Sequence, residues 1–282
     1  MTHVVKQGQT LLKIAKYYNI PLAAILDMNR IADPNLIRVG EVILLPPMTT
    51  DSMEHHAESV LGPPAINRTR FRFSRGDYFP EPQEKNLIVL HFTAGTSVSG
   101  AFHTWTRNLT RIGTSYIIDR DGKIFEVFPP HGWAYHLGMQ TGNPNYVHDR
   151  RSIGIELVNV GPLKLRGKEL KFWPYDFSAH YCSEEEHGKY TSVSHKGYDY
   201  WASFSDEQYD ALNGLLSLLS QEFPCFQGAP MLRPGKFDAK WTGITSWTGI
   251  TSHEAFRQDK LDLGPAFAWE RLLLDGRKLH ES

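Results

Sequence analysis

The hydrophobic positions after residue 66 change repeatedly between strand-like runs and helical stripes. Apolar runs predict buried strands at residues 86–92 and 152–158. Residues 114–119 and 123–128 predict two more strands, joined in a tight hairpin by Arg120-Asp121-Gly122. Because strands and helices mix along this region, we expect an α/β domain in which helices flank one central mixed β-sheet.

Three segments of the same region have helical spacing. Residues 98–108 predict a helix with Phe102 and Trp105 on one face, and residues 265–274 predict a final helix. Between them, Ser205-Asp206-Glu207-Gln208 forms a capping box, which is typical of a helix start. The apolar stripe of the helix that follows consists of Tyr209, Leu212, Leu215, Leu216 and Leu219.

The first 47 residues carry a separate pattern of order β-α-α-β. A strand is predicted at Val4-Val5 and a closing strand at residues 42–45. Thr10 can cap the first helix between them, and Pro21 opens the second. The expected inner positions are Leu11, Ile14, Ala15 and Tyr18 in the first helix, and Ala24, Ile25 and Met28 in the second.

Composition shifts along the chain predict two domains and a linker. Residues 48–66 are polar and proline-rich without apolar periodicity, which is typical of a linker between domains at 1–47 and 67–282. Residues 161–204 are rich in aromatic side chains and histidine and fit the pattern of the second domain less well. We interpret them as an insertion that either lines a cleft or covers the sheet as a peripheral flap. Finally, Trp241–Ser246 is repeated at once as Trp247–Ser252.

Composition and charge narrow the class of function. Of the 282 residues, 41% are hydrophobic, and the net charge of −1 favours neither nucleic acid nor a membrane surface as a partner. No apolar stretch approaches the roughly 20 residues that span a bilayer, so no membrane insertion is expected. The first residues lack the pattern of a cleaved signal peptide, so we expect synthesis in the cytoplasm and delivery by a non-classical route. Cys182 and Cys225 are expected to be two buried thiols, with a disulfide as the alternative.

Three residues far apart in the sequence have the composition of a catalytic metal site. His91 ends an apolar run, His253 follows Thr248-Gly249-Ile250-Thr251-Ser252, and Asp262 lies in a short loop motif. Two imidazoles and one carboxylate leave the fourth tetrahedral position of a zinc ion open for water. For His91 alone, a core histidine is the commoner outcome.

Glu156 is a carboxylate within an otherwise apolar strand. Burial of a carboxylate is costly unless the group has a task or a partner. The alternatives are a general base or an ion pair with Arg150 or Arg151.

The N-terminal segment resembles a LysM domain over its whole length. The matching residues are Val5–Leu11, Ile14-Ala15, Asn29 and Val39–Pro46. The resemblance implies binding of peptidoglycan or chitin through the two loops between strands and helices. The implied glycan contacts are Gly8, Gln9, Thr10, Leu11 and Asn29, although a turn and a cap explain Gly8 and Thr10 locally.

Six further motifs occur in a fixed order. They are Leu90–Gly95, Ser115–Gly122, Ala134–Gly138, Arg151–Glu156, Thr251–His253 and Lys260–Phe267. Together they resemble the zinc-dependent N-acetylmuramoyl-L-alanine amidases, or amidase-2 domains, which share a fold with peptidoglycan recognition proteins. Leu263 departs from this pattern because the family usually has proline there, which implies a less rigid loop.

The amidase resemblance also implies the site. It places one Zn²⁺ per chain on His91, His253 and Asp262. Glu156 is implied as the general base and Lys260 as the group that steadies the oxyanion. His136 and Thr93 are implied to face the substrate.

The expected function is cleavage of the amide bond between N-acetylmuramic acid and the L-alanine of the peptidoglycan stem peptide. We favour an antibacterial effector that acts in the periplasm or cell wall, with an immunity protein and components of a secretion apparatus as partners. The alternatives are a phage endolysin with the same activity and a non-catalytic peptidoglycan recognition protein.

Overall fold

A computed structural model describes residues 2–5, 9–18, 20–31, 37–46, 64–107, 110–138, 146–173, 176–232, 246–257, 259–274 and 277–278. The chain separates into two units, Met1–Gly62 and Pro63–Ser282. Most of the predicted linker lies outside the described residues. None of the helices in the described ranges has the length and apolarity needed to cross a membrane.

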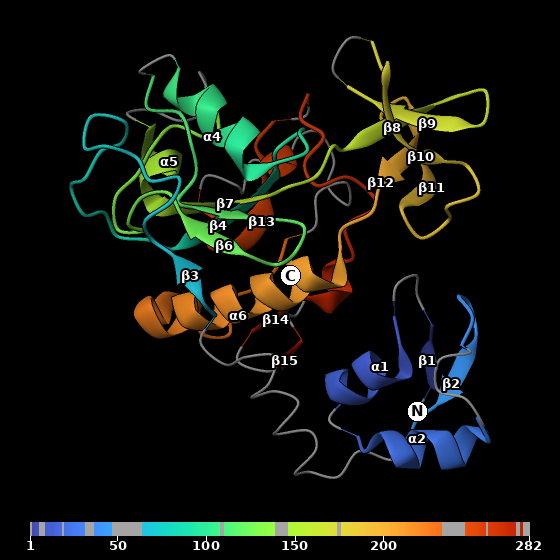
Figure 1. The fold of residues 1–282 in the computed structure, drawn as a ribbon. Helices are drawn as coiled ribbons and strands as arrows, with labels where there is room; N and C mark the ends of the chain where they lie inside the picture. The colour runs from blue at the N-terminus through green and yellow to red at the C-terminus, as the bar shows by residue number, and fades with distance from the viewer. Residues whose placement is uncertain are drawn as a thin grey trace. The chain divides into compact units, whose positions relative to one another are not determined.

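The N-terminal unit pairs two short antiparallel strands and packs two helices against them (Figure 1). The elements are β1 (Thr2–Val4), α1 (Leu11–Tyr17), α2 (Leu22–Asn29) and β2 (Val42–Leu44), which is the predicted order. One inner position was predicted wrongly. Met28 is exposed, and Ile25 is the buried residue of α2, because the last turn of this helix meets β2 through Asn29 instead.

Asn29 joins the end of α2 to the edge of β2. Its side-chain Nδ2 donates to the carbonyl oxygen of Leu44 at 2.7 Å, and its Oδ1 accepts from the backbone N–H of Leu44 at 2.6 Å. Nδ2 also donates to the carbonyl oxygen of Ile25 at 2.8 Å. The amide group therefore acts like one residue of an additional strand, and this structural role occupies the polar atoms of the side chain.

Replacing Asn29 by alanine should loosen β2. The two backbone groups of Leu44 lose their partner, and each hydrogen bond contributes about 1 kcal/mol, so the unit should lose about 2 kcal/mol of stability. Amide hydrogen exchange of the full chain should therefore accelerate at residues 42–44. Asp27→Ala, an exposed position on the same helix, is the control. Equal exchange rates in parent and variant would contradict this role.

The second unit is built on a six-stranded mixed sheet of order β13-β4-β7-β5-β6-β3. The four strands from β13 to β5 are parallel, and β5 and β6 form the predicted antiparallel hairpin. Helices lie on both sides of this sheet, as expected from the sequence (Figure 1). The strands are β3 (Ile66–Asn67), β4 (Leu87–Phe92), β5 (Tyr116–Ile118), β6 (Ile124–Glu126), β7 (Ser152–Leu157) and β13 (Gly249–Ser252).

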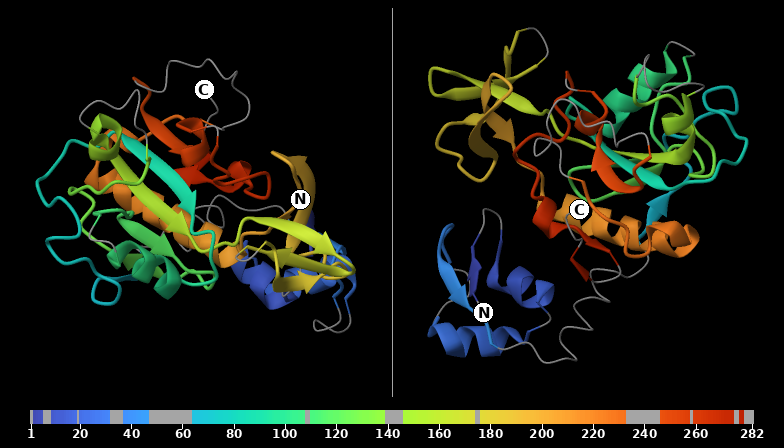
Figure 2. Two further views of the ribbon diagram at one scale, coloured as in Figure 1. Left: turned by 90° about the horizontal axis from the view of Figure 1, so that it is seen from above. Right: turned by 180° about the vertical axis from the view of Figure 1, so that it is seen from behind.

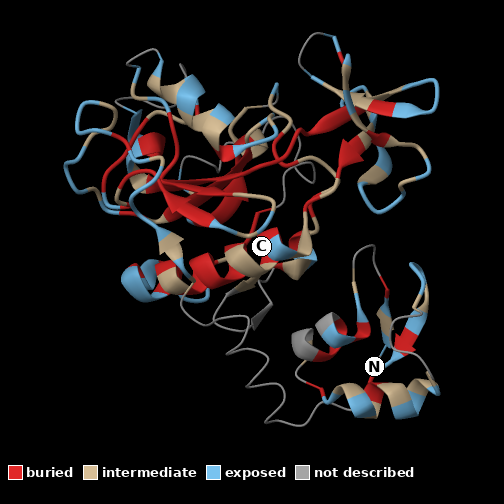
Figure 3. Cartoon of the chain, in the orientation of Figure 1, coloured by how far each residue is buried: buried red, intermediate tan, exposed pale blue. Residues whose placement is uncertain are grey.

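The two faces of the central sheet carry different helices. Along β5, Tyr116 packs in the cluster of α6 (Asp206–Glu222), whereas Ile117 packs in that of α4 (Val98–Thr106). The predicted capping box starts α6, and the five apolar residues of its stripe are all buried. Figure 3 shows the strands of this sheet as the most continuously buried part of the unit. A shorter helix, α5 (Val147–Arg151), leads into β7.

The helix predicted at residues 265–274 is not formed. The segment contains a 3-10 turn, η5 (Trp269–Arg271), and the strand β14 (Leu273–Leu274), which pairs with β15 (Arg277–Lys278) beyond it. Side chains of α6 accept hydrogen bonds from backbone N–H groups that would pair within the segment if it were helical. The backbone N–H of Ala268 donates to the hydroxyl of Tyr209 at 2.7 Å, and that of Leu273 donates to Asn213 at 2.8 Å.

The segment interpreted as an insertion forms a sheet of its own. It has five antiparallel strands in the order β10-β9-β8-β12-β11. Figure 2 shows from two further sides that these strands form a separate layer beside the central sheet. The strands are β8 (Pro162–Arg166), β9 (Glu169–Phe172), β10 (Ala179–Ser183), β11 (Tyr190–His195) and β12 (Tyr198–Ala202).

The two cysteines are both free thiols. Cys182 is buried in the core of the five-stranded sheet, as predicted. Cys225 is exposed, so the prediction of a second buried thiol is wrong. It lies in the 3-10 turn η2 (Pro224–Phe226) that follows α6, where its thiol donates to the carbonyl oxygen of Lys85 at 2.8 Å.

Candidate metal centre

The predicted site residues lie at the carboxyl ends of adjacent parallel strands. His91 belongs to β4, Glu156 to β7, and His253 follows β13 directly in the 3-10 turn η4 (His253–Ala255). His91 and Glu156 are register partners, so their side chains project from the same face of the sheet. This face is opposite to α6, because the neighbouring residues Leu90 and Ile155 point to the α6 cluster.

His91, His253 and Asp262 converge on one buried point. One ligand atom from each lies within 4.8 Å of the other two. Nδ1 of His253 is 3.2 Å from Oδ2 of Asp262. The other carboxylate oxygen of Asp262 accepts from the backbone N–H of Phe92 at 3.1 Å, and its carbonyl oxygen accepts from Ser252 at 2.8 Å. The ends of β4 and β13 therefore hold the aspartate in place.

The hydrogen bond on the far side of the His253 ring sets its tautomer. Nε2 of His253 lies 2.7 Å from the carbonyl oxygen of Leu137. Because a carbonyl oxygen can only accept, Nε2 carries the proton in this contact. The lone pair of Nδ1 then faces Asp262, as a metal ligand requires.

A chain of hydrogen bonds sets the tautomer of His91 in the same way. The hydroxyl of Ser152 donates to the carbonyl oxygen of Asp149 at 3.2 Å, so it accepts from Nε2 of His136 at 2.7 Å. Nδ1 of His136 must then accept from Nε2 of His91, which lies 2.9 Å away. Nδ1 of His91 keeps its lone pair for a metal ion.

Burial keeps the imidazole rings of His91 and His136 neutral. Desolvation, with smaller contributions from His253, His136 and Lys260, holds the pKa of His91 well below its usual value. Desolvation also lowers the pKa of His136 to about 4, although the nearby Asp149 opposes the shift. Both nitrogens of His136 are engaged, so we propose that His136 orients His91, in place of the substrate contact expected from the sequence.

His136→Ala should therefore weaken metal binding without removing a ligand. Loss of a group that orients a metal-binding histidine lowers metal affinity roughly 10- to 100-fold. Competition with a chromogenic chelator measures the zinc affinity of each variant. His180→Ala replaces an exposed histidine and serves as the control. A His136→Ala variant that binds zinc as tightly as the parent would exclude the orienting role.

Glu156 is buried beside the cluster, and its Oε2 has no hydrogen-bond partner among the residues that the structure describes. Burial raises the pKa of Glu156 well above 4.5, the charge of Asp262 raises it further, and Lys260 opposes this. Both arginines considered as partners have other contacts. Arg151 donates to the carbonyl oxygen of Trp247 at 2.8 Å, and Arg150 lies over the ring of Trp133. The carboxyl group is therefore directed toward the site, where a cation would offset its charge.

Lys260 precedes Asp262 in the same loop and is partly exposed. Its charge contributes to the lowered pKa of His91, after burial and the neighbouring histidines. Its carbonyl oxygen accepts from Nζ of Lys196 at 2.6 Å. Lys196 could not be predicted as part of the site, because no motif links this residue to it.

The hydroxyl of Thr93 has contacts within its own loop. It lies 3.2 Å from the carbonyl oxygen of Gly95 and accepts from the backbone N–H of Asn159 at 3.3 Å. Thr93 therefore shapes the loop that follows β4, and a substrate contact from its side chain stays a prediction.

The predicted glycan-binding residues of the N-terminal unit differ in burial and in their contacts. Leu11 is fully buried in the core, which removes its side chain from the candidate contacts. Asn29 holds β2, as described above. Gln9 lies 2.7 Å from His3, and Thr10 is exposed. Gly8 lies outside the described residues.

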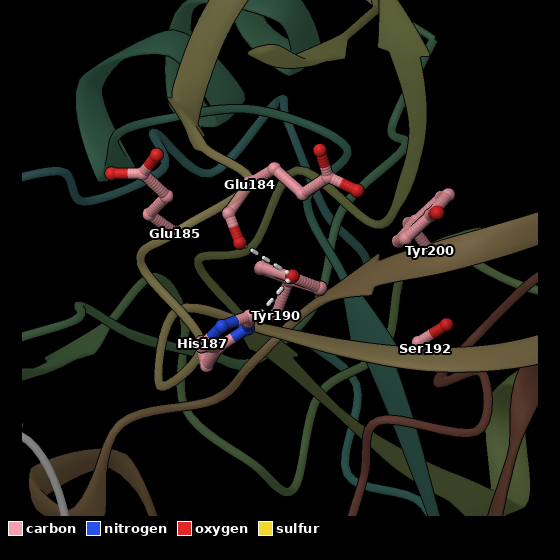
Figure 4. A pocket seen from close by; sticks show the side chains of 6 residues that line it. All are labelled: Glu184, Glu185, His187, Tyr190, Ser192 and Tyr200. Atoms are coloured by element: carbon pink, nitrogen blue, oxygen red, sulfur yellow. Dashed lines mark hydrogen bonds between the residues drawn. The ribbon is translucent and has the colours of Figure 1, made fainter. Parts of the chain in front are cut away.

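A separate hollow of about 590 Å³ lies on the five-stranded sheet (Figure 4). The hydroxyl of Tyr190 donates to the carbonyl oxygen of Glu184 at 2.8 Å and lies 3.1 Å from the ring of His187. None of the predicted site residues lines this hollow. Its lining consists of Glu184, Glu185, His187, Tyr190, Ser192 and Tyr200.

Comparison with known proteins matches both units. Residues 81–265 match the family model described as N-acetylmuramoyl-L-alanine amidase, which is more than half of the chain. Residues 3–46 match the model of the LysM domain.

Two curated proteins of Bacillus subtilis (strain 168) are similar to parts of the chain. N-acetylmuramoyl-L-alanine amidase XlyA is 50% identical over 91 residues, which are 32% of this chain and 29% of that protein. N-acetylmuramoyl-L-alanine amidase XlyB is 32% identical over 88 residues, which are 31% of this chain and 27% of that protein. The matches span less than a third of each relative.

Among solved structures, one similar protein is the N-acetylmuramyl-L-alanine amidase AmiD from E. coli in complex with a muropeptide substrate. The match has a TM-score of 0.43 and 19% sequence identity, and it covers 70% of this chain and 59% of that chain.

Proposed function

Because the chain belongs to the N-acetylmuramoyl-L-alanine amidase family, we propose that it hydrolyses the amide bond between N-acetylmuramic acid and the L-alanine of the peptidoglycan stem peptide. The observation that carries the proposal is the convergence of His91, His253 and Asp262 beside Glu156, whose Oε2 has no partner among the described residues. A recognition protein without catalysis has no need of this set of groups.

The three converging residues fit a zinc ion. They offer two imidazole nitrogens and one carboxylate oxygen, which is the donor set of catalytic zinc sites. Hydrogen bonds on the far side of each imidazole ring set the tautomers of His91 and His253. A fourth position stays open for water or substrate. When bound, zinc supplies a Lewis acid that lowers the pKa of water and polarises a carbonyl group.

Glu156 and Lys260 supply the proton transfer and the charge compensation. Glu156 takes the proton from the attacking water and later gives it to the amine of the departing L-alanine. Burial raises the pKa of this carboxyl group, which makes it a stronger base toward water and allows it to carry the proton on to the amine. The ammonium of Lys260 stabilises the negative charge that develops on the former carbonyl oxygen.

The LysM match supports a second contact with the same polymer. A unit that binds the glycan strand keeps the catalytic unit at a high local concentration of its substrate bonds. Peptidoglycan is therefore the proposed partner of both units.

Digestion of purified sacculi tests the proposed activity. Mass spectrometry of the released products should find stem peptides that begin with L-alanine and glycan strands without peptides. Sacculi that bind the chain but stay intact would favour a recognition protein. Cleavage of glycosidic bonds would show that the reaction is assigned to the wrong bond.

A further proposal concerns how the protein reaches the cell wall to act there. We favour an antibacterial effector delivered by a secretion apparatus, with an immunity protein as its inhibitor, and a phage endolysin is the alternative. Production of the chain together with the proteins encoded beside it separates the two. An exported neighbour that binds the chain and blocks sacculus digestion would support the effector, and a neighbour that opens the inner membrane would support the endolysin.

A further inference from the structure

The five-stranded sheet contacts the loop that carries Lys260 and Asp262. This loop joins His253 to Gly264 and is called here the metal loop. At the turn between β11 and β12, Nζ of Lys196 donates to the carbonyl oxygen of Lys260 at 2.6 Å. The same ammonium lies 2.6 Å from Oε1 of Glu254. His195, the preceding residue, lies 3.2 Å from the same carboxylate oxygen.

These two contacts connect the two ends of the metal loop. Glu254 follows the ligand His253 directly, and Lys260 lies two positions before the ligand Asp262. A single ammonium therefore links a neighbour of each ligand. Because the carbonyl oxygen of Lys260 and the carboxylate of Glu254 both lie in this loop, a shift of either end would break one of these two contacts.

The backbone of the turn does not explain a lysine at position 196. Lys196 and Gly197 have φ values of 47° and 82°, and His195 pairs with Tyr198 across the turn. Both central residues of this two-residue hairpin thus have positive φ, as in a type I′ turn, which favours asparagine, aspartate or glycine. Lysine at the first position carries a steric cost, so its side-chain contacts are the better reason for its presence.

A second contact joins the same sheet to the far end of the metal loop. The ring of Trp201 lies over Gly264, where a Cβ would come within 2.5 Å of ring atom Cε3. Gly264 also has a φ of 72°. The nearby ring and the left-handed backbone therefore both favour glycine at this position. Trp201 is buried, and strand alternation places it on the opposite face from Tyr200, which lines the hollow.

We propose that Lys196 is a positioning residue that fixes the spacing of the metal loop, and that the five-stranded sheet is a brace for the metal centre. The catalytic consequence rests on the proposed function, whereas the consequence for metal binding does not. Without the ammonium, the carbonyl of Lys260 loses its partner, and Lys260 and Asp262 can move away from His253. Small displacements of this kind weaken metal binding and misplace the groups that act on the substrate.

Lys196→Asn tests the brace, because asparagine suits the turn and removes the ammonium. The variant should bind zinc about tenfold more weakly, and kcat on sacculi should fall about tenfold with KM within about twofold of the parent. Amide hydrogen exchange should accelerate at residues 259–264. The melting temperature of the unit should not fall, since the turn backbone is relieved. Lys196→Arg, which keeps a charged donor, should restore most of the zinc affinity.

Lys189→Asn is the matched control. Lys189 lies in the same layer and pairs with Glu186, and its side chain has no described contact with the metal loop. It should leave zinc affinity and exchange unchanged. Unchanged zinc affinity and exchange in Lys196→Asn would overturn the brace, even if the parent digests sacculi. If the parent does not digest sacculi, the proposed function fails, and zinc affinity and exchange still decide the brace. Should Lys196→Asn not fold, Lys196→Met replaces it in the same measurements.

Discussion

Glu156→Gln should lower kcat on peptidoglycan by about 10²- to 10⁴-fold, the usual contribution of a general acid–base group. Glutamine has nearly the same shape but can neither take a proton from water nor give one to the departing amine. Glu156 is buried beside the three converging residues, and its Oε2 has no partner among the described residues. KM and zinc affinity should stay close to those of the parent, because Glu156 is not one of the three converging ligands.

The stability of the same variant separates loss of chemistry from loss of fold. Burial, with the charge of Asp262, holds the pKa of Glu156 above its unfolded value of 4.5. The folded metal-free chain therefore binds this proton more tightly than the unfolded chain, and its stability falls as the pH rises above 4.5. Glutamine removes this loss, so metal-free Glu156→Gln should melt at the same or a higher temperature than the parent at pH 8. An inactive variant that melts much lower would attribute the lost activity to misfolding.

Removal of the metal ion should abolish activity and destabilise the second unit together. A chelator should stop the release of stem peptides, and added zinc should restore it. A ligand that binds only the folded state at 1,000 times its dissociation constant adds about 4 kcal/mol of stability. Thermal unfolding with and without zinc measures this difference.

Asp262→Ala is the control for the metal experiment. It removes one ligand and the contact with the backbone N–H of Phe92. Zinc should then restore neither activity nor stability. Full activity of the parent after exhaustive chelation would show that the cluster has no catalytic metal.

The sequence predicted the parts of the fold that depend on local patterns. The apolar runs around His91 and before Glu156 became adjacent parallel strands, because unbroken runs of this kind suit strands buried on both faces. The start of α6 was also predictable, because the capping box joins Ser205 to Gln208, only three residues away. These features need no knowledge of the rest of the chain.

Features that depend on distant contacts could not be predicted in this way. The prediction of a final helix was wrong because Tyr209 and Asn213, in α6, accept hydrogen bonds from the backbone N–H groups of residues 268 and 273. Asn29 matched a family motif, yet its structural role appears only when β2 lies beside α2. Lys196 carried no signal at all, since its partners lie in a loop some 60 residues further along the chain.

The same limit applies to the candidate site. The three candidate ligands and Glu156 were predicted through motifs, and the structure brings them together. The orientation of His136 behind His91 could not be predicted from the sequence, because it depends on which hydroxyl and carbonyl groups surround the ring. A motif identifies a residue type at a position, whereas the hydrogen bonds around it decide what the residue does.

The strand β13 is the second copy of a duplicated hexapeptide, and this gives the edge of the central sheet two nearly equivalent partners. Gly249-Ile250-Thr251-Ser252 pairs with β4, and Gly243-Ile244-Thr245-Ser246 has the same sequence six positions earlier. The strand contacts alone cannot distinguish the copies, and an even-numbered shift keeps every side chain on its own face. The residue that follows does distinguish them, because the first copy is followed by Trp247 and the second by His253. A metal ion held by His91, His253 and Asp262 would therefore favour pairing of the second copy, because only that register brings His253 to the site and gains the binding free energy of the ion.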